Sequence, residues 1–542
     1  MFGQIQDVPL LVNRILDHAL INHGEREIVS RLVEGNIHRE TYADAHLRAR
    51  KLSQALQKMG IGERDVVATM AWNTHRHFEA WYGITGVGGV YHTLNPRLFP
   101  EQLTYIINHA EDKVIMTDLS FVPVLEGIEK DIPNVKAIII MTDAAHMPDT
   151  SLSNVVCYED LIDSHNGDFN WVEVDERSPS GMCYTSGTTG NPKGVCYTHR
   201  SNVLHTLASN SADVMGIRSA DSVMPVVPMF HANAWGLAFS APSVGAKIVN
   251  PGPNMDGESI YQLLTDEEVT FSAAVPTVWL MLLQHLEANN LKLPKLSNVT
   301  IGGSAVPRVM LEKFERDYGV LVKHAWGMTE LSPLGSIASF KAGMEKMSFD
   351  EQMDIKVKQG RPPYLVEMKI TDDDGNELPR DGKAFGHLMV RGPFIVAEYV
   401  KGDGGEILDK DGFFDTGDVA TLDPLGFMQI TDRAKDVIKS GGEWISSIEI
   451  ENIAVGFDKI QEAAVIGVEH PKWDERPLLI VVKNEGVDVT KEEVLAYLEG
   501  KIAKWWMPDD VAFVDEIPHT ATGKIQKLNL RQQFADYKLP TA

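Results

Sequence analysis

The chain has 542 residues, and single hydrophobic cores rarely grow past roughly 250–300 residues, so we expect more than one domain. Its 50 basic and 76 acidic side chains leave a formal net charge of −26, which argues against a nucleic-acid partner. Three cysteines do not make a disulfide framework, and no signal peptide or apolar run of transmembrane length is found. We therefore expect a cytoplasmic protein without a transmembrane segment.

The first part of the chain alternates short apolar runs with helical patterns. Apolar residues at positions 52, 55, 56 and 59 follow the helical repeat, and Gly60 stands at the stop position. Buried strands are predicted at 66–71, 114–116 and 137–141, and a buried helix at 78–91. This alternation is typical of α/β folds, in which helices cover both faces of a parallel sheet.

A loop rich in glycines and hydroxyls follows a short apolar run that could be a strand. It reads Thr-Ser-Gly-Thr-Thr-Gly-Asn-Pro-Lys-Gly from Thr185 to Gly194. Glycines bring backbone N–H groups close to a ligand, hydroxyls donate hydrogen bonds, and Lys193 adds a mobile charge. A kinase-type P-loop is disfavoured, because Gly194 follows the lysine and the glycine spacing differs. The pattern predicts contacts to nucleotide phosphates from Thr185, Ser186, Gly187, Thr188, Thr189, Gly190 and Lys193.

The whole decapeptide resembles the signature loop of the adenylate-forming superfamily, which includes acyl-CoA synthetases, firefly luciferase and peptide-synthetase adenylation domains. The resemblance implies a reaction in two halves. A small-molecule carboxylate first attacks the α-phosphorus of ATP, with Mg²⁺ as cofactor, and gives acyl-AMP and pyrophosphate. A thiol then displaces AMP.

The next motif concerns the acid. Residues 228–235 read Pro-Met-Phe-His-Ala-Asn-Ala-Trp and contain the Phe-His pair of the superfamily. The resemblance implies that His231 lies beside the carboxylate being activated and that Trp235 walls the acyl pocket. The implied pocket is completed by Gly302, Met328 and Pro333.

Two further motifs match the adenine and metal sites of the superfamily. Residues 302–307 read Gly-Gly-Ser-Ala-Val-Pro, and residues 324–330 read His-Ala-Trp-Gly-Met-Thr-Glu. A flat aromatic can stack on a purine while glycine-rich backbone covers the other face. The resemblance implies that Thr329 binds phosphate and that Glu330 holds Mg²⁺, a hard cation suited to carboxylate oxygen. The implied nucleotide contacts are Gly303, Ser304, Ala305, His324, Ala325, Trp326, Gly327, Met328 and Thr329.

A small β subdomain is predicted next, from short strand patterns at 369–371, 386–391 and 426–431 separated by Asp/Gly turns. Between them, the Phe-Asp-Thr-Gly-Asp run ending at Asp418 matches the ribose-binding turn of the superfamily. An ionised carboxylate only accepts hydrogen bonds, which suits two sugar hydroxyls. Arg433 matches an arginine that contacts ribose and phosphate.

The resemblance also implies a second domain that moves. Residues 1–434 would form the large N-terminal domain with the ATP and acyl sites, and residues 435–542 a smaller mobile α+β domain that turns about Lys435. The tail ends in the Pro-x-Thr-x-Thr-Gly-Lys motif, whose Lys524 would be carried into the site for adenylation. The predicted catalytic residues are thus Thr185, His231, Glu330 and Lys524, and the predicted CoA contacts are Gly441, Gly442, Glu443, Trp444 and Trp473.

Details of the motifs limit which thiol accepts the acyl group and which carboxylic acid is activated. No carrier module follows Lys524, which favours CoA as the thiol, although Met507 and Asp509 stand where related ligases often have basic residues for the CoA 3′-phosphate. Acetate enzymes carry a tryptophan where this chain has Gly327, so a pocket deeper than acetate is predicted.

The chain as a whole resembles the methylmercaptopropionate-CoA ligases of marine bacteria, which implies a role in dimethylsulfoniopropionate breakdown. A general medium-chain fatty acyl-CoA ligase is the close alternative. A luciferase-like oxygenase would share every motif and is a weaker alternative. A non-catalytic nucleotide-binding paralogue is disfavoured because Lys193, Glu330 and Lys524 are all present. A homodimer is expected.

Overall fold

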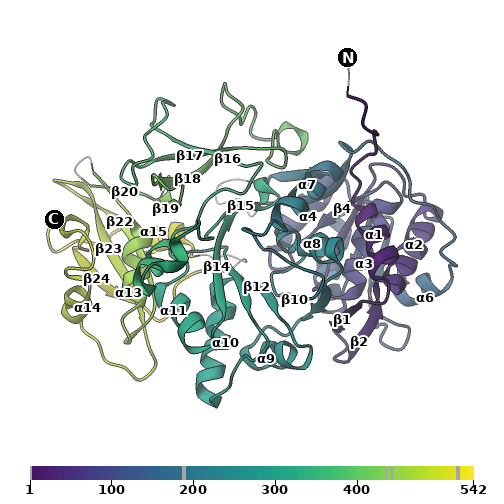
Figure 1. The fold of residues 1–542 in the computed structure, drawn as a ribbon, viewed down its shortest axis with the longest axis horizontal. Helices are drawn as coiled ribbons and strands as arrows, with labels where there is room; N and C mark the ends of the chain where they lie inside the picture. The colour runs from purple at the N-terminus through teal and green to yellow at the C-terminus, as the bar shows by residue number, and fades with distance from the viewer. Residues whose placement is uncertain (1–2, 186–190, 435, 441–442, 520–524) are drawn as a thin grey trace.

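The structure is a computed structural model and describes residues 3–185, 191–434, 436–440, 443–519 and 525–542, with the backbone alone for 443 and 444 (Figure 1). None of the helices formed by these residues is both long enough and apolar enough to span a membrane.

Seven described strands form the first sheet of the large domain, in the order β7-β6-β5-β3-β4-β8-β9, and only β8 and β9 are antiparallel. The strands are β3 (Val66–Met70), β4 (Val90–Thr93), β5 (Val114–Thr117), β6 (Ala137–Ile140), β7 (Val155–Cys157), β8 (Pro179–Tyr184) and β9 (Gly194–Thr198). The accompanying helices are α1 (Asn13–His23), α2 (Tyr42–Lys58), α3 (His75–Gly86), α4 (Pro100–Ala110), α5 (Val122–Ile128), α6 (Tyr158–Asp163) and α7 (His199–Ser209).

The predicted helix over 78–91 is partly wrong. Helix α3 ends at Gly86, and Tyr91 belongs to strand β4. Gly88, with a φ of +80°, turns the chain between them, a conformation that favours glycine. Both elements are buried on all sides, so their apolar residues run together without a change of period.

Eight described strands form the second sheet, in the order β15-β14-β13-β12-β10-β11-β1-β2. The strands are β1 (Glu27–Arg31), β2 (Ile37–Thr41), β10 (Ser222–Pro225), β11 (Lys247–Asn250), β12 (Phe271–Ala274), β13 (Asn298–Ile301), β14 (Leu321–Gly327) and β15 (Leu334–Ile337). Its helices are α8 (Leu237–Val244), α9 (Gly257–Asp266), α10 (Pro276–Asn289), α11 (Arg308–Asp317) and α12 (Phe349–Lys356).

One hydrophobic core joins the two sheets. It contains Val67 from β3 and Ile248 from β11, together with Trp81 from α3 and Phe239 from α8, whose rings lie 5.6 Å apart. Helices from both halves of the large domain are therefore packed between the sheets, and burial of their aromatic side chains stabilises the stack.

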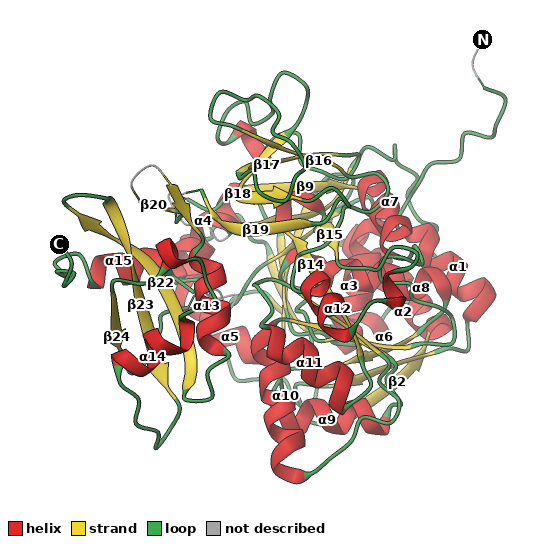
Figure 2. Ribbon diagram, turned by 60° about the vertical axis from the view of Figure 1, so that its left-hand side comes forward, coloured by secondary structure: helices red, strands yellow, loops and turns green. Residues whose placement is uncertain are grey.

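The remaining strands form two smaller sheets. Strands β16 (Glu367–Thr371), β17 (Gly386–Arg391), β18 (Phe414–Leu422) and β19 (Met428–Arg433) make an antiparallel subdomain. The C-terminal domain contains β20 (Ile438–Ser440), β21 (Glu443–Ile445), β22 (Ile460–His470), β23 (Asp474–Lys483), β24 (Asp510–Phe513), α13 (Ser447–Val455), α14 (Lys491–Leu498) and α15 (Lys527–Gln533). Figure 2 shows it beside the large domain.

The predicted fold class, a large domain of stacked α/β sheets with a small β subdomain and a smaller α+β domain, is confirmed. The boundary predicted between residues 434 and 435, and the mobility of the second domain, stay predictions. Strand β19 ends at Arg433, and β20 of the next sheet begins at Ile438.

Candidate active site

The predicted phosphate loop connects the antiparallel strands β8 and β9. At its base, the Thr185 N–H donates to the Lys193 carbonyl oxygen at 2.9 Å, and the Lys193 N–H donates to Thr185 Oγ1 at 3.4 Å. These two contacts hold the ends of the loop together. The predicted residues Ser186, Gly187, Thr188, Thr189 and Gly190 lie outside the described residues.

A chain of side chains connects this loop to the predicted metal carboxylate. Lys193 Nζ lies 5.0 Å from the centroid of the Tyr399 ring, and the Tyr399 hydroxyl donates to Glu330 Oε1 at 2.8 Å. Glu330 is 6% exposed. Burial beside Glu330 raises the pKa of Tyr399, so its hydroxyl stays protonated and donates. A buried carboxylate held by a neutral donor fits Mg²⁺, which prefers oxygen ligands.

Thr329 lies next to this carboxylate on a short helical turn. Its carbonyl oxygen accepts a hydrogen bond from the Tyr197 hydroxyl at 2.8 Å, and the Glu330 carbonyl accepts from the Val396 N–H at the same distance. The two backbone contacts fix the Thr-Glu pair between strand β9 and the β subdomain.

The predicted adenine and ribose residues meet at one buried carboxylate. The Trp326 indole N–H donates to Asp418 Oδ2 at 2.9 Å, and Arg433 Nε lies 2.9 Å from Asp418 Oδ1. Asp418 is 3% exposed, and Trp326 packs against Gly335, where an added Cβ would lie 2.2 Å from the ring. Each carboxylate oxygen keeps a second lone pair, so Asp418 can still accept from sugar hydroxyls.

The other two adenine segments also run side by side. A Cβ added at Gly302 would lie 2.6 Å from the Ala325 carbonyl oxygen, so only glycine allows this approach. His324 bonds through Nδ1 to the Val357 carbonyl oxygen at 3.1 Å, and burial lowers the pKa of His324 to about 4. The His324 ring is therefore neutral at pH 7. Gly303 and Ser304 are exposed and Ala305 is half-buried, beyond the end of β13.

The segment after His231 has an unusual backbone. His231 is half-buried and precedes four successive non-glycine residues, 232–235, with φ between +44° and +54°. A left-handed backbone costs roughly 1–2 kcal/mol per residue, and such strain concentrates at functional sites. The turn places the Trp235 ring 3.3 Å from the Cβ position at Gly302, so these two predicted acyl-pocket residues are neighbours.

The remaining pocket residues are also adjacent. The Met328 N–H donates to the Pro333 carbonyl oxygen at 3.0 Å. A Cβ at Gly327 would lie 2.0 Å from that same oxygen. A side chain at position 327 would therefore require the backbone to move. The local structure is built for the glycine that stands there, and not for the tryptophan of the acetate enzymes.

The predicted CoA residues lie apart from these groups, on the C-terminal domain. Trp473 is half-buried between β22 and β23, with its ring edge-on to Trp505 at 4.9 Å and Lys472 Nζ 4.4 Å from its centroid. Asp509 is paired with Arg476 at 2.7 Å. The predicted residues Lys435, Gly441, Gly442 and Lys524 lie outside the described residues, and Glu443 and Trp444 fall in β21, where only the backbone is described.

Asn73 is a site residue that the sequence did not reveal. Its Nδ2 donates to the carbonyl oxygens of Pro225 and Val227 at 2.7 and 2.9 Å, and its Oδ1 accepts from the Met229 N–H at 2.7 Å. Asn73 is 1% exposed. It therefore holds the backbone that leads from β10 to His231, although it lies about 150 residues earlier in the chain.

We expect Asn73→Ala to slow acid activation by about ten-fold or more while nucleotide affinity changes little, because the loss leaves three buried backbone groups unpaired at roughly 1–3 kcal/mol each. Pyrophosphate release with varied acid and calorimetry with AMP measure the two effects. Asn13→Ala is the control, since buried Asn13 donates one hydrogen bond to the Tyr82 carbonyl. Equal losses of activity in both variants would mean that Asn73 supports only the fold.

Comparisons with known proteins agree with this arrangement. Residues 16–400 match the family model described as AMP-binding enzyme, and residues 449–524 match the AMP-binding enzyme C-terminal domain. The chain is similar to the 3-methylmercaptopropionyl-CoA ligase of Ruegeria lacuscaerulensis, with 49% identity over 99% of both chains. It is also similar to the medium-chain-fatty-acid–CoA ligase of Ectopseudomonas oleovorans, with 48% identity over 99% of this chain and 98% of the other.

A solved structure shows the same fold. The anthranilate CoA ligase AuaEII in complex with anthranoyl-AMP matches with a TM-score of 0.86 at 21% identity, over 97% of this chain and 98% of that one. The protein belongs to the AMP-binding enzyme family, which confirms its predicted membership in the adenylate-forming superfamily. Within it, the relatives named above place the chain among the acyl-CoA synthetases.

Proposed function

We propose that the protein is an AMP-forming acid–CoA ligase that activates a short- to medium-chain carboxylate, with 3-methylmercaptopropionate as the preferred acid. The proposal is carried by two contact chains that join the residues predicted to bind the phosphates, the metal, the adenine and the ribose. They are Lys193–Tyr399–Glu330 and Trp326–Asp418–Arg433. The similarity to two CoA ligases over nearly the whole chain supports it.

The first half of the reaction depends on positioning and charge neutralisation. Glu330 would hold Mg²⁺, which would offset phosphate charge when bound. The phosphate loop and Lys193 bind the phosphates, Asp418 orients the ribose, and His231 orients the attacking carboxylate. Lys524 stabilises the charge that the carboxylate and the α-phosphate share in the transition state.

The second half uses the C-terminal domain. Trp473 offers a ring face for the nucleotide of CoA, and Lys472, 4.4 Å from that ring, supplies a cation near it. Asp509 pairs with Arg476, and we propose Lys472 as the cation that takes the place of the basic residues missing at positions 507 and 509. We further propose that the enzyme is a cytoplasmic homodimer.

The acid is limited by the pocket wall. Gly327 leaves the pocket deeper than acetate requires, while Trp235 and Met328 restrict its length. A thioether sulfur against an aromatic ring contributes about 0.3–1.5 kcal/mol, which favours methylmercaptopropionate over a plain chain of equal length. The medium-chain relative keeps a general fatty acyl-CoA ligase as the second candidate.

A panel of carboxylates assayed for pyrophosphate release, with and without CoA, tests the proposal. We expect 3-methylmercaptopropionate to give the highest kcat/KM, with acyl-CoA formed only when CoA is present. A higher value for hexanoate or octanoate would favour the general ligase. Oxygen uptake or light emission from the acyl-AMP would favour the oxygenase and contradict the proposal.

Trp235→Ala should shift the preference toward longer acids. The vacated volume admits extra methylenes, each worth about 0.8 kcal/mol when buried. Comparing hexanoate, octanoate and decanoate with methylmercaptopropionate measures the shift. Trp171→Ala is the control, because Trp171 is half-buried and bonds to Asp17 instead. An unchanged order of preference would place Trp235 outside the pocket wall.

A further inference from the structure

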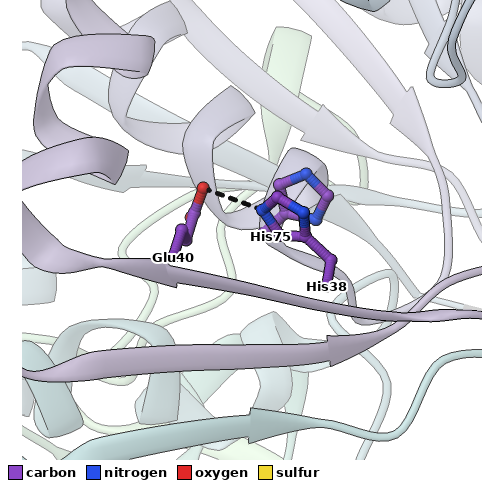
Figure 3. A group of neighbouring side chains, drawn as sticks. All are labelled: His38, Glu40 and His75. Atoms are coloured by element: carbon purple, nitrogen blue, oxygen red, sulfur yellow. Dashed lines mark hydrogen bonds and ion pairs between the residues drawn. The ribbon is translucent and has the colours of Figure 1, made fainter.

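Three metal-ligand side chains meet far from the phosphate loop, on the edge strand β2 and at the start of α3. His38 and Glu40 alternate on β2, so both point to one face of the strand, and His75 is the first residue of α3 (Figure 3). One ligand atom from each residue lies within 4.8 Å of the other two. We propose that His38, Glu40 and His75 bind a divalent transition-metal ion such as Zn²⁺.

His75 gives the first argument. It is fully buried, and both of its ring nitrogens lack a hydrogen-bond partner among the described residues. Glu40 Oε1 accepts no hydrogen bond from a donor group among the described residues, although the Glu79 carboxyl lies within hydrogen-bonding reach of Glu40, and Glu40 Oε2 lies 3.4 Å from His38 Nε2. Unpartnered buried polar atoms are costly, and native structures rarely keep several of them together. A metal ion would satisfy the imidazole and the carboxylate at once.

The charges around the site give a second, independent argument. Arg48 Nε contacts Glu79 at 2.7 Å and Glu40 at 3.6 Å, and Arg76 contacts Glu34 and Glu159, both at 2.7 Å. Four carboxylates thus face two guanidinium groups. With all six groups ionised the cluster carries a net charge of −2, which one divalent cation balances.

The ring geometry shows what binding requires. The two imidazole rings stack with centroids 3.8 Å apart and planes inclined by 20°, so their lone pairs lie in two nearly parallel planes and one ring has to turn before both can bind the same ion. His38, with its side chain 32% exposed, can turn toward Glu40 and His75 and also gives the ion a path from solvent. Two imidazoles and a carboxylate, with water in the fourth position, form a tetrahedral zinc set.

A second cluster nearby is the main competitor. Glu34, Asp143 and His146 also lie within reach of one another. His146 is exposed and Asp143 half-buried, and the two pair with each other at 2.8 Å, while Glu34 already accepts from Arg76 and Thr142. Only one oxygen of this cluster, Glu34 Oε2, is buried without a partner among the described residues. A bound ion would therefore satisfy fewer buried polar atoms here than at His38, Glu40 and His75.

The test uses the full chain without a tag, stripped with a chelator and kept in excess Mg²⁺ to block hard-ion sites. Competition with a chromophoric chelator at about pH 7.5 should show one tight Zn²⁺ site, and Co²⁺ should give the visible bands of a tetrahedral complex. His38→Gln and Glu40→Gln should each weaken Zn²⁺ at least ~10–100-fold, since even the loss of an outer partner has that effect. His146→Gln is the matched control and should leave binding unchanged.

Three outcomes would overturn the site. The first is a wild-type Zn²⁺ affinity no higher than that of His38→Gln, and the second is an unchanged Zn²⁺ affinity in folded Glu40→Gln. The third is loss of Zn²⁺ binding in His146→Gln, which would assign the ion to the second cluster. Circular dichroism confirms that each variant is folded. The test does not depend on the proposed ligase activity.

Discussion

Lys524→Ala should lose about 10²–10³-fold in the rate of pyrophosphate release and still convert acyl-AMP and CoA into thioester at a near-normal rate. The charge shared between the attacking carboxylate and the α-phosphate arises only in the first transition state. A residue that stabilises this charge, and then leaves with the C-terminal domain, affects only the first half-reaction.

Several contacts join the C-terminal domain to the strand that precedes the predicted hinge, and the predicted rotation would have to change them. Asp432, three residues before the predicted hinge at Lys435, accepts from the Ser447 backbone N–H at 3.2 Å and from its hydroxyl. The buried Lys527 ammonium lies 3.9 Å from Asp432 and 2.8 Å from Glu451. These contacts tie α13 and α15 to the end of β19. We expect Lys435→Pro, by locking the predicted hinge, to impair the thioester half more than adenylation.

Supplying chemically prepared acyl-AMP separates the two halves in both variants. Lys538→Ala is the control, because Lys538 is an exposed lysine of the same C-terminal tail. If Lys524→Ala were equally defective in both halves, the alternation mechanism would be wrong and Lys524 would have a structural role.

The motif residues could be predicted because each motif keeps its chemistry within a few positions. Trp326, Asp418 and Glu330 are predicted in this way, and the fold brings the Trp326 indole nitrogen to 2.9 Å from Asp418 Oδ2 across 92 residues of sequence. Asn73 could not be found, since an asparagine after a strand is ordinary loop chemistry until the chain returns with Val227 and Met229. The signal that could identify it is tertiary.

Tyr399 illustrates the same limit. Nothing in its local sequence marks it, yet it contacts both Lys193, a predicted phosphate ligand, and Glu330, the predicted metal ligand. The buried cluster of His38, Glu40 and His75 was likewise not predicted. Its members come from a hairpin strand and a helix start, and their spacing of 2 and 35 positions matches no short ligand motif.

Asp418→Ala should weaken ATP and AMP about 10–100-fold and leave the affinity for the acid nearly unchanged. The Asp418 carboxylate is predicted to accept hydrogen bonds from the ribose hydroxyls, and losing hydrogen bonds to a charged group costs about 1.5–3 kcal/mol. It also binds the Trp326 indole N–H and Arg433, so the substitution releases the predicted adenine-stacking ring and a predicted phosphate contact together.

Asp418→Asn keeps an acceptor for Trp326 but loses the ion pair with Arg433. Its nucleotide affinity should lie between that of the wild type and that of Asp418→Ala. Asp415→Ala, an exposed carboxylate of the same strand, removes the same charge and should bind nucleotide normally. Calorimetric titration with AMP decides the matter: nucleotide affinity in Asp418→Ala equal to that of Asp415→Ala would remove Asp418 from the ribose site.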